Sequence, residues 1–213
     1  MHVHYLDHHA TTPVREDVAS AMIPFLTKHF GNPGSPHAYG WAAEEVVEIA
    51  REKVARVLNA APREIVFTSG ATEANDLAIR GVLAAYAAKG RHVISAPTEH
   101  KAVRDLLRHL ENRGDCEVTW LAVDGAGRVS ADAVQAALRP DTVLVTLMHA
   151  NNEIGTVHPL AEIGAVCKAA GVLLHTDAAQ SVGKIPVDVE ALQVDLLSLS
   201  AHKVYGPKGV GAL

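Results

Sequence analysis

The chain has 213 residues, a formal net charge of −5 and a pI of about 6.2, and 48% of its residues are hydrophobic. Such a hydrophobic fraction excludes a disordered chain, and the length favours one globular domain, or two small ones at most. The acidic balance, the absence of a Lys/Arg run and the lack of an apolar stretch of about 18 residues argue against nucleic acid or a membrane as the main partner.

The N-terminal part of the chain predicts an extended arm followed by helices. Residues 1–35 would form an arm with one helix over residues 15–29, and the Gly- and Pro-rich turn at residues 31–36 would separate them from the rest. Residues 41–58 place apolar side chains at spacings of three and four, the period of a helix with one apolar face. We therefore expect an arm at residues 1–35 and a larger domain at residues 36–213.

From residue 64 onward, short apolar runs alternate with helical patterns. Strands are expected at residues 64–68, 92–95, 117–121, 142–148, 172–176 and 194–200. Helices are expected at residues 73–88, 101–111, 131–138 and 160–170. This alternation predicts an α/β fold with a mostly parallel sheet and helices on both of its faces.

The two ends of the chain give further expectations. The first residues lack the basic and apolar regions of a signal peptide, and two cysteines are too few for a disulfide framework, so we expect a cytoplasmic protein. Residues 206–213 (GPKGVGAL) predict a turn and the first residues of another strand. Because a finished domain seldom stops where a strand begins, we expect a continuation beyond Leu213.

Polar residues follow five of the six expected strands. Their segments are residues 69–73 (SGATE), 98–100 (TEH), 149–153 (HANNE), 177–180 (DAAQ) and 200–203 (SAHK). Ligands of parallel sheets bind at the carboxyl ends of the strands, which share one edge. The sequence therefore predicts that these segments meet in a single site.

Each segment also has an ordinary structural explanation. Residues 69–72 could bind an anion at a helix start or simply cap the helix. Asp177 could pair with a cationic ring nitrogen or cap the next segment, Lys203 could trap an aldehyde or be a solvated surface lysine, and His100 could be structural. Neither a Walker loop nor a G-x-G-x-x-G pattern is present, and no set of ligands has zinc-site spacing, so no metal is expected.

Taken together, the five segments supply what pyridoxal phosphate requires. That cofactor needs a lysine for its Schiff base, an acid for its pyridine nitrogen, a cradle for its phosphate and an aromatic side chain over its ring. The combination of Lys203, Asp177, residues 69–72 and His100 meets each requirement. The sequence therefore predicts pyridoxal 5′-phosphate as the cofactor.

Seven motifs occur in order along the chain. They are residues 5–13 (YLDHHATTP), 31–37 (GNPGSPH), 67–73 (FTSGATE), 98–100 (TEH), 151–155 (NNEIG), 175–180 (HTDAAQ) and 202–209 (HKVYGPKG). From Tyr5 to Leu213 the chain resembles the cysteine desulfurases, a branch of the class V aminotransferases. The resemblance implies the large domain of the type I pyridoxal-phosphate-dependent fold, without the small C-terminal domain.

The resemblance also implies a role for each matching residue. Lys203 would form the Schiff base and move protons at the substrate Cα, Asp177 would keep the pyridine nitrogen protonated, and His100 would stack on the ring and act as an acid–base. Gln180 would contact the ring oxygen, and Asn152 would lie near that oxygen and the substrate carboxylate. The remaining cofactor-binding residues would be Ala71, Thr72, Ser200 and His202, which hold the phosphate, and Ala201, where many members have Gly.

The implied reaction converts L-cysteine to L-alanine and passes the sulfur, as a persulfide on an enzyme cysteine, to a sulfur acceptor or iron–sulfur scaffold protein. In the family the persulfide cysteine, an arginine for the substrate carboxylate and a phosphate contact from the second subunit of a homodimer follow the Lys203 segment. Cys116, expected in a turn, and Cys167, expected on an apolar helix stripe, match neither the motif nor the position of that cysteine. We therefore expect this chain alone to lack the sulfur step.

Two other functions stay open at the level of sequence. One is another class V enzyme, such as a selenocysteine lyase or an aminotransferase. The other is a fragment without catalytic activity that binds the cofactor or a protein partner. A cofactor absorption spectrum would separate the fragment from the enzymes, and release of alanine from cysteine would separate a desulfurase from the other enzymes.

Overall fold

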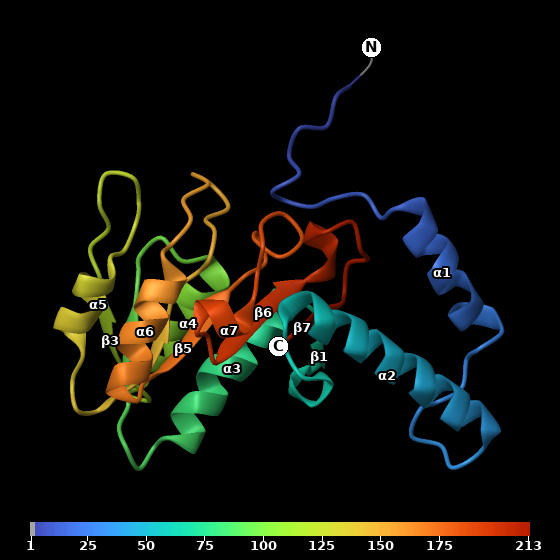
Figure 1. Cartoon of the computed structure of the whole chain (residues 1–213), viewed down its shortest axis with the longest axis horizontal. Coiled ribbons are helices and arrows are strands. Elements are labelled where there is room, and N and C mark those ends of the chain that lie inside the picture. Colours follow the sequence, from blue (N-terminus) through green and yellow to red (C-terminus); the bar gives the residue numbers. More distant parts are fainter. Residues whose placement is uncertain (1–2) are drawn as a thin grey trace.

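The computed structural model describes residues 3–213, so Met1 and His2, the first residues of the predicted arm, lie outside the described part. Helices and strands alternate along the chain (Figure 1). The helices are α1 (Glu16–Thr27), α2 (Ala38–Leu58), α3 (Ala71–Ala85), α4 (Lys101–Asn112), α5 (Ala131–Ala137), α6 (Leu160–Ala170) and α7 (Val189–Leu192), and 3₁₀ turns lie at Pro62–Glu64 and Ala201–Lys203. The strands are β1 (Phe67–Thr68), β2 (His92–Ser95), β3 (Glu117–Trp120), β4 (Thr142–Thr146), β5 (Leu173–Asp177), β6 (Leu196–Ser200) and β7 (Gly211–Ala212).

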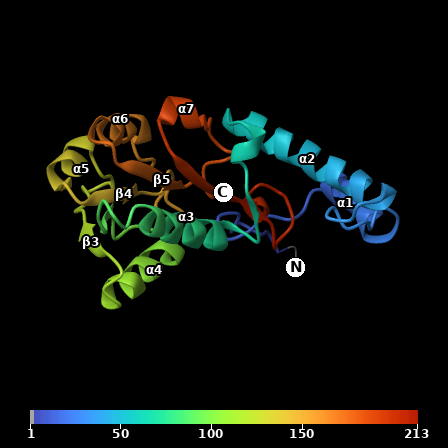
Figure 2. The ribbon, with the colours of Figure 1, turned by 90° about the horizontal axis from the view of Figure 1, so that it is seen from below.

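The strands form a seven-stranded sheet in the order β1-β7-β6-β5-β4-β2-β3. The strands β2 to β6 pair in parallel, whereas β7 pairs antiparallel with both β1 and β6. Helices α3 and α4 cover one face of the sheet, and α5, α6 and α7 lie on the other (Figure 2). The predicted fold class, a mostly parallel sheet with helices on both faces, is confirmed, and β7 is the strand expected near the end of the chain.

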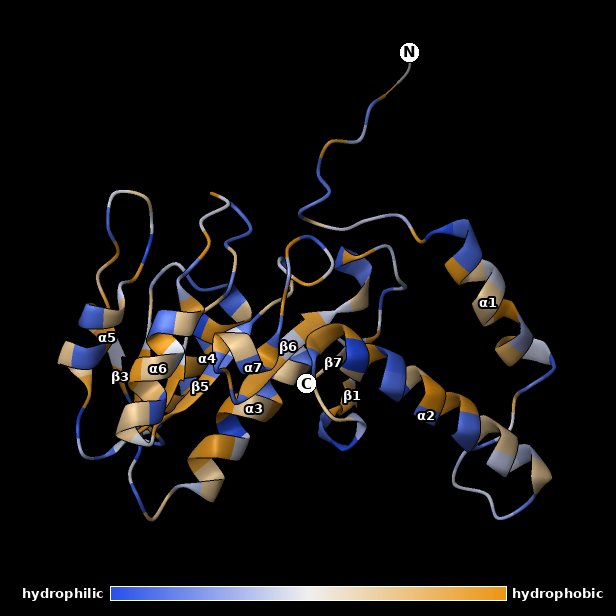
Figure 3. Cartoon of the chain, viewed as in Figure 1, coloured by the Kyte–Doolittle hydropathy of each residue, from blue (hydrophilic) through white to orange (hydrophobic). Residues whose placement is uncertain are grey.

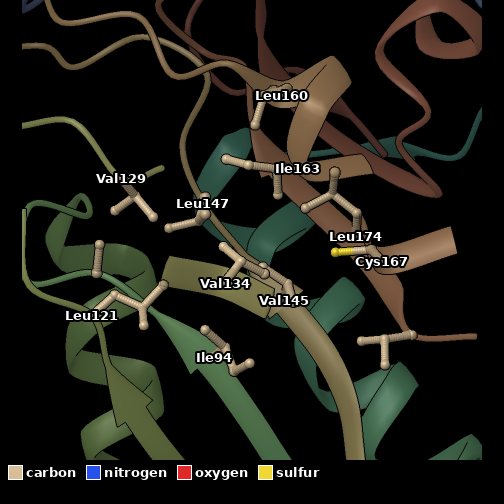
Figure 4. Close-up of a cluster of buried hydrophobic side chains, with 12 residues drawn as sticks. Ile94, Leu121, Val129, Val134, Val145, Leu147, Leu160, Ile163, Cys167 and Leu174 are labelled. Carbon is tan, nitrogen blue, oxygen red and sulfur yellow. The ribbon is translucent and has the colours of Figure 1, made fainter. Parts of the chain in front are cut away.

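The central strands fill two cores because their alternate side chains point to opposite faces of the sheet. On the side of α5 and α6, Ile94 and Val145 pack with Ile163 (Figure 4). On the side of α3 and α4, the neighbouring strand residues Val93 and Leu144 belong to a second buried cluster. Every residue of β2 and β4 is buried, in agreement with the mostly apolar character of these segments in the sequence.

The first strand is shorter than predicted. Residues 62–64 form a 3₁₀ turn because Pro62 begins it and the Glu64 carboxylate accepts a hydrogen bond from the Ala61 N–H at 2.8 Å. Backbone pairing begins only at Val66, whose N–H donates to the Leu213 carbonyl at 2.7 Å. The other predicted strands differ from the observed ones by two residues or fewer at either end.

Helix α2 differs from expectation in its packing. It begins three residues earlier than predicted because the His37 side chain accepts a hydrogen bond from the Gly40 N–H. Its C-terminal end is buried at Ala55 and Leu58, but Val57 is 64% exposed. Helices α1 and α2 extend away from the sheet, and apolar residues occur along both (Figures 1 and 3). In the described part of the chain, no helix has the length and apolar character needed to cross a membrane.

Candidate active site

The carboxyl ends of the central strands border a cavity of about 430 Å³, within the size range of small-molecule sites. The segments that follow β1, β2, β4, β5 and β6 line it, and Ala10 of the N-terminal arm joins them. Nine predicted site residues lie in this lining: Ala71, Thr72, His100, Asn152, Asp177, Gln180, Ser200, His202 and Lys203. The structure therefore brings together residues that are distant in sequence, as the shared sheet edge predicts.

Ala201 is not among the residues that line the cavity. Its carbonyl accepts hydrogen bonds from the N–H groups of Val204 (3.0 Å) and Gly206 (2.9 Å). A Cβ at Gly206 would lie only 2.8 Å from the Ala201 Cβ, so the two residues are in close contact. The structure therefore places Ala201 inside the turn that carries Lys203, where it closes the loop.

A site suited to an anion lies where α3 begins. Gly70 adopts φ +153° and ψ 179°, a conformation that side chains disfavour, so the chain can turn sharply from β1 into the helix. The Ala74 N–H donates to the Gly70 carbonyl at 3.1 Å, and the N–H groups of Ala71 and Thr72 precede this first helical bond. The Ser200 hydroxyl oxygen lies 3.7 Å from the position of a Cβ at Gly70. The helix dipole, free N–H groups and a hydroxyl can together bind a phosphate group.

Asp177 ends β5 and brings a carboxylate to the cavity, although the residue is only 5% exposed. Its Oδ2 accepts a hydrogen bond from Asn75 Nδ2 at 2.8 Å, and its Oδ1 accepts from the Ala179 N–H at 3.0 Å. Among residues 3–213, Asn75 Oδ1 has no hydrogen-bond partner. Both carboxylate oxygens are thus fixed in position by groups on α3 and on the loop after β5.

Lys203 follows β6 directly, in the second 3₁₀ turn. Its Nζ donates to the backbone carbonyls of His9 and Ala10 in the N-terminal arm, the latter at 3.0 Å. Burial lowers the pKa of Lys203, and the nearby carboxylates of Asp177 and Asp7 offset part of this effect. A lowered pKa increases the fraction of free amine at neutral pH, which a nucleophilic lysine requires.

The loops that carry His100 and Asn152 are joined to each other. His100 caps α4, and its Nδ1 accepts a hydrogen bond from the Ala102 N–H at 3.2 Å, so Nε2 carries the proton when the ring is neutral. Asn151, beside Asn152, donates to the Thr98 carbonyl at 3.0 Å. This bond links the loop after β4 to the loop after β2, and it holds His100 and Asn152 near one another at the cavity.

Glu99 makes a second link between the same two loops. It is 3% exposed, and its Oε1 accepts a hydrogen bond from the Met148 N–H at 2.6 Å. Burial raises the pKa of Glu99 well above its ordinary value, and the charge of Asp177 adds to this effect. Burial and the charge of Asp177 both favour the uncharged form of the carboxyl, and Glu99 links the loop after β2 to the loop after β4.

Gln180 and His202 face both the cavity and the N-terminal arm. Gln180 Nε2 donates to the His9 carbonyl at 2.8 Å, and Gln180 Oε1 accepts from Lys184 Nζ at 2.6 Å. His202 Nδ1 lies 3.1 Å from Thr11 Oγ1. Burial, followed by the charges of neighbouring lysines, lowers the pKa of His202, so the ring favours its neutral form.

Both cysteines are buried and lie outside the cavity lining. The expectation that Cys116 occupies a turn is wrong: it immediately precedes β3, is 2% exposed and packs in the core beneath α4. Cys167 is in the core on α6, as predicted. Burial raises the pKa of Cys116 to about 11 and that of Cys167 to about 12, so neither is a thiolate at neutral pH. No group of three or more His, Cys, Asp or Glu side chains is arranged as a metal site within residues 3–213.

Several residues with no role expected from the sequence hold the predicted site residues in place. Asn75 fixes Asp177, while Asn151 and Glu99 join the loops of the cavity. The position of Asn75 could have been noticed in the sequence, because it is a polar residue four positions after Ala71 on the buried face of α3. The roles of the other two depend on contacts between loops, which no local spacing reveals.

We expect His175 to make the protein less stable in acid. Its ring lies between the hydroxyls of Thr146 (2.8 Å) and Ser198 (3.0 Å) in the middle of the sheet. Burial lowers the pKa of His175 from 6.5 to about 3, so the unfolded chain binds one more proton than the folded chain between these values. The free energy of unfolding therefore decreases as the pH falls through this window, by about 1.4 kcal/mol per pH unit from this residue.

Urea unfolding at a series of pH values would measure the effect. The buried carboxyl of Glu99 acts in the opposite direction, because its raised pKa lets the folded chain bind the extra proton. The test therefore compares two variants. In His175→Gln, the slope of the free energy of unfolding against pH in acid should decrease by the equivalent of about one proton. In His109→Gln, which changes an exposed histidine, this slope should stay the same. Equal slopes in the two variants would contradict the assignment.

The chain is similar to known proteins in both sequence and structure. Residues 4–213 match the family model described as Aminotransferase class-V. The cysteine desulfurase IscS of Anaeromyxobacter dehalogenans (strain 2CP-C) is 58% identical over 210 residues, which cover 98% of this chain and 52% of that protein. The chain thus spans about half the length of the curated relatives it matches.

The fold of the chain is also similar to that of solved structures. The structure titled "SspA in complex with cysteine" matches with a TM-score of 0.94 and 44% identity, over 98% of this chain and 60% of that one. A NifS-like protein matches with a TM-score of 0.94 and 42% identity, over 98% of this chain and 57% of that one.

Proposed function

The chain belongs to the class V aminotransferase family, and on this basis we propose that it is the cofactor-binding part of a pyridoxal-phosphate-dependent cysteine desulfurase. The proposed reaction converts L-cysteine to L-alanine and transfers the sulfur to an acceptor, either a sulfur-transfer protein or an iron–sulfur scaffold. The whole protein is proposed to be a cytoplasmic homodimer. The observation that carries the proposal is that Lys203, Asp177 and the start of α3 line one cavity.

The residues present fit pyridoxal phosphate. The N–H groups of Ala71 and Thr72, together with Ser200 and His202, form a cradle for a phosphate at the sharp turn that Gly70 permits. Asp177 offers a fixed carboxylate to a cationic ring nitrogen. Lys203 offers an amine whose pKa is lowered by burial. These are the chemical groups that the cofactor's phosphate, pyridine nitrogen and aldehyde require.

The other cavity residues complete the proposed assignment. His100 would cover the face of the ring, Gln180 would contact the ring oxygen, and Asn152 would lie near that oxygen and the substrate carboxylate. All three line the cavity, which supports these positions. The contacts of Ala201 support a role in closing the turn that carries Lys203, and not a contact with the cofactor.

Pyridoxal phosphate supplies an aldehyde for amines and an electron sink for bonds at the substrate Cα. Lys203 would hold the cofactor when substrate is absent and would move a proton at Cα when substrate is present. Asp177 stabilises positive charge on the ring nitrogen through its fixed carboxylate. His100, with its proton on Nε2, exchanges a proton with the substrate.

The test uses a part of the reaction that requires only residues of this chain. The chain is incubated with pyridoxal phosphate and L-alanine in D₂O, and loss of the alanine Cα–H signal is followed by NMR. We expect exchange with L-alanine and none with D-alanine, because a fixed lysine reaches only one face of the substrate. A parallel reaction with L-cysteine is assayed for alanine.

Each outcome separates the candidate functions. Exchange of L-alanine supports the proposal, and formation of alanine from L-cysteine extends it to the full reaction. Formation of pyruvate from L-alanine would indicate an aminotransferase instead. Faster reaction with L-selenocysteine than with L-cysteine would indicate a selenocysteine lyase, and absence of both cofactor absorption and exchange would contradict an enzymatic role for the chain.

A further inference from the structure

The N-terminal arm is bonded to the turn that carries Lys203, although most of the chain separates them. The Thr12 N–H donates to the His202 carbonyl at 2.9 Å, and the Arg15 N–H donates to the Tyr205 carbonyl at 3.1 Å. Lys203 Nζ also donates to two carbonyls of the arm. The arm thus contacts both the backbone of the turn and the end of the lysine side chain.

The hydroxyl of Thr12 makes two further bonds, one on each side of Lys203. Thr12 Oγ1 donates to the His202 carbonyl at 2.9 Å and accepts from the Tyr205 N–H at 2.7 Å. Thr12 is only 5% exposed, so water cannot readily replace these partners. One buried hydroxyl therefore spans the segment in which Lys203 lies.

The backbone at Tyr205 depends on these bonds. Tyr205 has φ +64°, in the left-handed region that residues with a Cβ seldom adopt. Such a conformation persists only when surrounding contacts hold it. Here the Tyr205 N–H is held by Thr12 Oγ1, and its carbonyl is held by the Arg15 N–H. Without the hydroxyl, the Tyr205 N–H loses its partner, and the turn beyond Lys203 is then held to the arm by the bond from the Arg15 N–H.

We propose that Thr12 is a positioning residue for Lys203, because its hydroxyl fixes the turn on both sides of the lysine and so directs the amine into the cavity. The inference rests on the proposed function, in which Lys203 is the amine that binds the cofactor. If Thr12 positions Lys203, the N-terminal arm is a part of the active site. If Thr12 has only a structural role, its hydroxyl attaches the arm to the domain and does not affect Lys203.

Three variants test the proposal. Thr12→Val keeps the shape of the side chain and removes the hydroxyl, and Thr12→Ser keeps the hydroxyl. Thr11→Val is the matched control: the Thr11 hydroxyl also contacts His202, at Nδ1 (3.1 Å), but makes no bond that spans Lys203 in the described part of the chain. Each variant is measured for pyridoxal phosphate affinity, for melting temperature and, without cofactor, for the pH dependence of Lys203 modification by an amine reagent.

In Thr12→Val we expect cofactor affinity to fall by about tenfold, the scale of losing one hydrogen bond to a buried group. The pH midpoint of Lys203 modification should shift upward, because a less constrained amine is more exposed and loses part of the burial that lowers its pKa. Thr12→Ser should stay close to the unmodified chain in both measurements, and Thr11→Val should keep the unmodified pH midpoint of Lys203 modification. A lower melting temperature in Thr12→Val with unchanged affinity and unchanged Lys203 modification would overturn the proposal.

Two further measurements cover the cases in which Thr12→Val does not fold or the proposed function is wrong. If Thr12→Val does not fold, amide exchange of Tyr205 in the unmodified chain is used: slow exchange supports the bond to Thr12, and exchange at the rate of an unprotected amide contradicts it. Borohydride reduction of the unmodified chain with cofactor, followed by peptide mapping, tests the proposed function separately. Failure to label Lys203 there would overturn the proposed function, whereas the cofactor-free modification assay would still report on Thr12.

Discussion

Replacing Lys203 with alanine is expected to abolish covalent attachment of pyridoxal phosphate to the chain. After borohydride reduction, mass spectrometry of the unmodified protein should show the pyridoxyl group on the peptide with Lys203, and the variant should show none there. The reason is chemical: Lys203 lies in the cavity with a pKa lowered by burial, and the cofactor aldehyde needs an unprotonated amine. Exchange at the alanine Cα should be lost as well, because the variant has no base at this position.

Two controls make the result specific. Lys184→Ala removes a neighbouring lysine whose Nζ is bonded to Gln180 at 2.6 Å, and it should keep the label on Lys203. Lys203→Arg keeps a positive charge but cannot form the imine, so it should bind the cofactor only without a covalent bond. Labelling mainly at Lys184 or Lys208 in the unmodified protein, or full Cα exchange in Lys203→Ala, would show that the assignment of Lys203 is wrong.

The second large effect is expected at Asp177. In Asp177→Ala, Asn75 Nδ2 and the Ala179 N–H lose their acceptor, and leaving the buried Asn75 donor unpaired should lower the free energy of unfolding by about 1–3 kcal/mol. The rate of Cα exchange should fall by roughly 100-fold or more, the scale of removing one preorganised electrostatic partner. Chemical denaturation and the NMR exchange assay measure the two effects separately.

Asp177→Asn separates charge from structure. Rotation of the Asn75 amide would present its Oδ1, which has no partner among residues 3–213, to the NH₂ group of the substituted side chain, and the amide oxygen of that side chain could still accept from the Ala179 N–H. We therefore expect this variant to keep most of its stability and its label on Lys203, but to lose Cα exchange. Exchange at the unmodified rate in Asp177→Asn would show that the negative charge has no catalytic role.

The sequence predicted the parts of this protein that depend on local order. The alternation of apolar strands and amphipathic helices gave the fold class and placed most strand boundaries within two residues of those observed. Because the carboxyl ends of parallel strands share one edge, the positions of Lys203, Asp177 and His100 after their strands were enough to predict a common cavity. The predicted start of the first strand was wrong, because Pro62, just before the expected strand, begins a 3₁₀ turn that extends into it.

What the sequence alone determined is therefore the order of the elements and the residues at the ends of the strands. The tertiary structure decided that Cys116 lies in the core, that the apolar face of α2 is only partly covered, and that Ala201 closes a turn. It also decided that the Thr12 hydroxyl reaches the carbonyl of His202, 190 positions later. Periodicity and capping act over a few residues, whereas these contacts depend on how distant segments pack, and no spacing along the chain encodes that geometry.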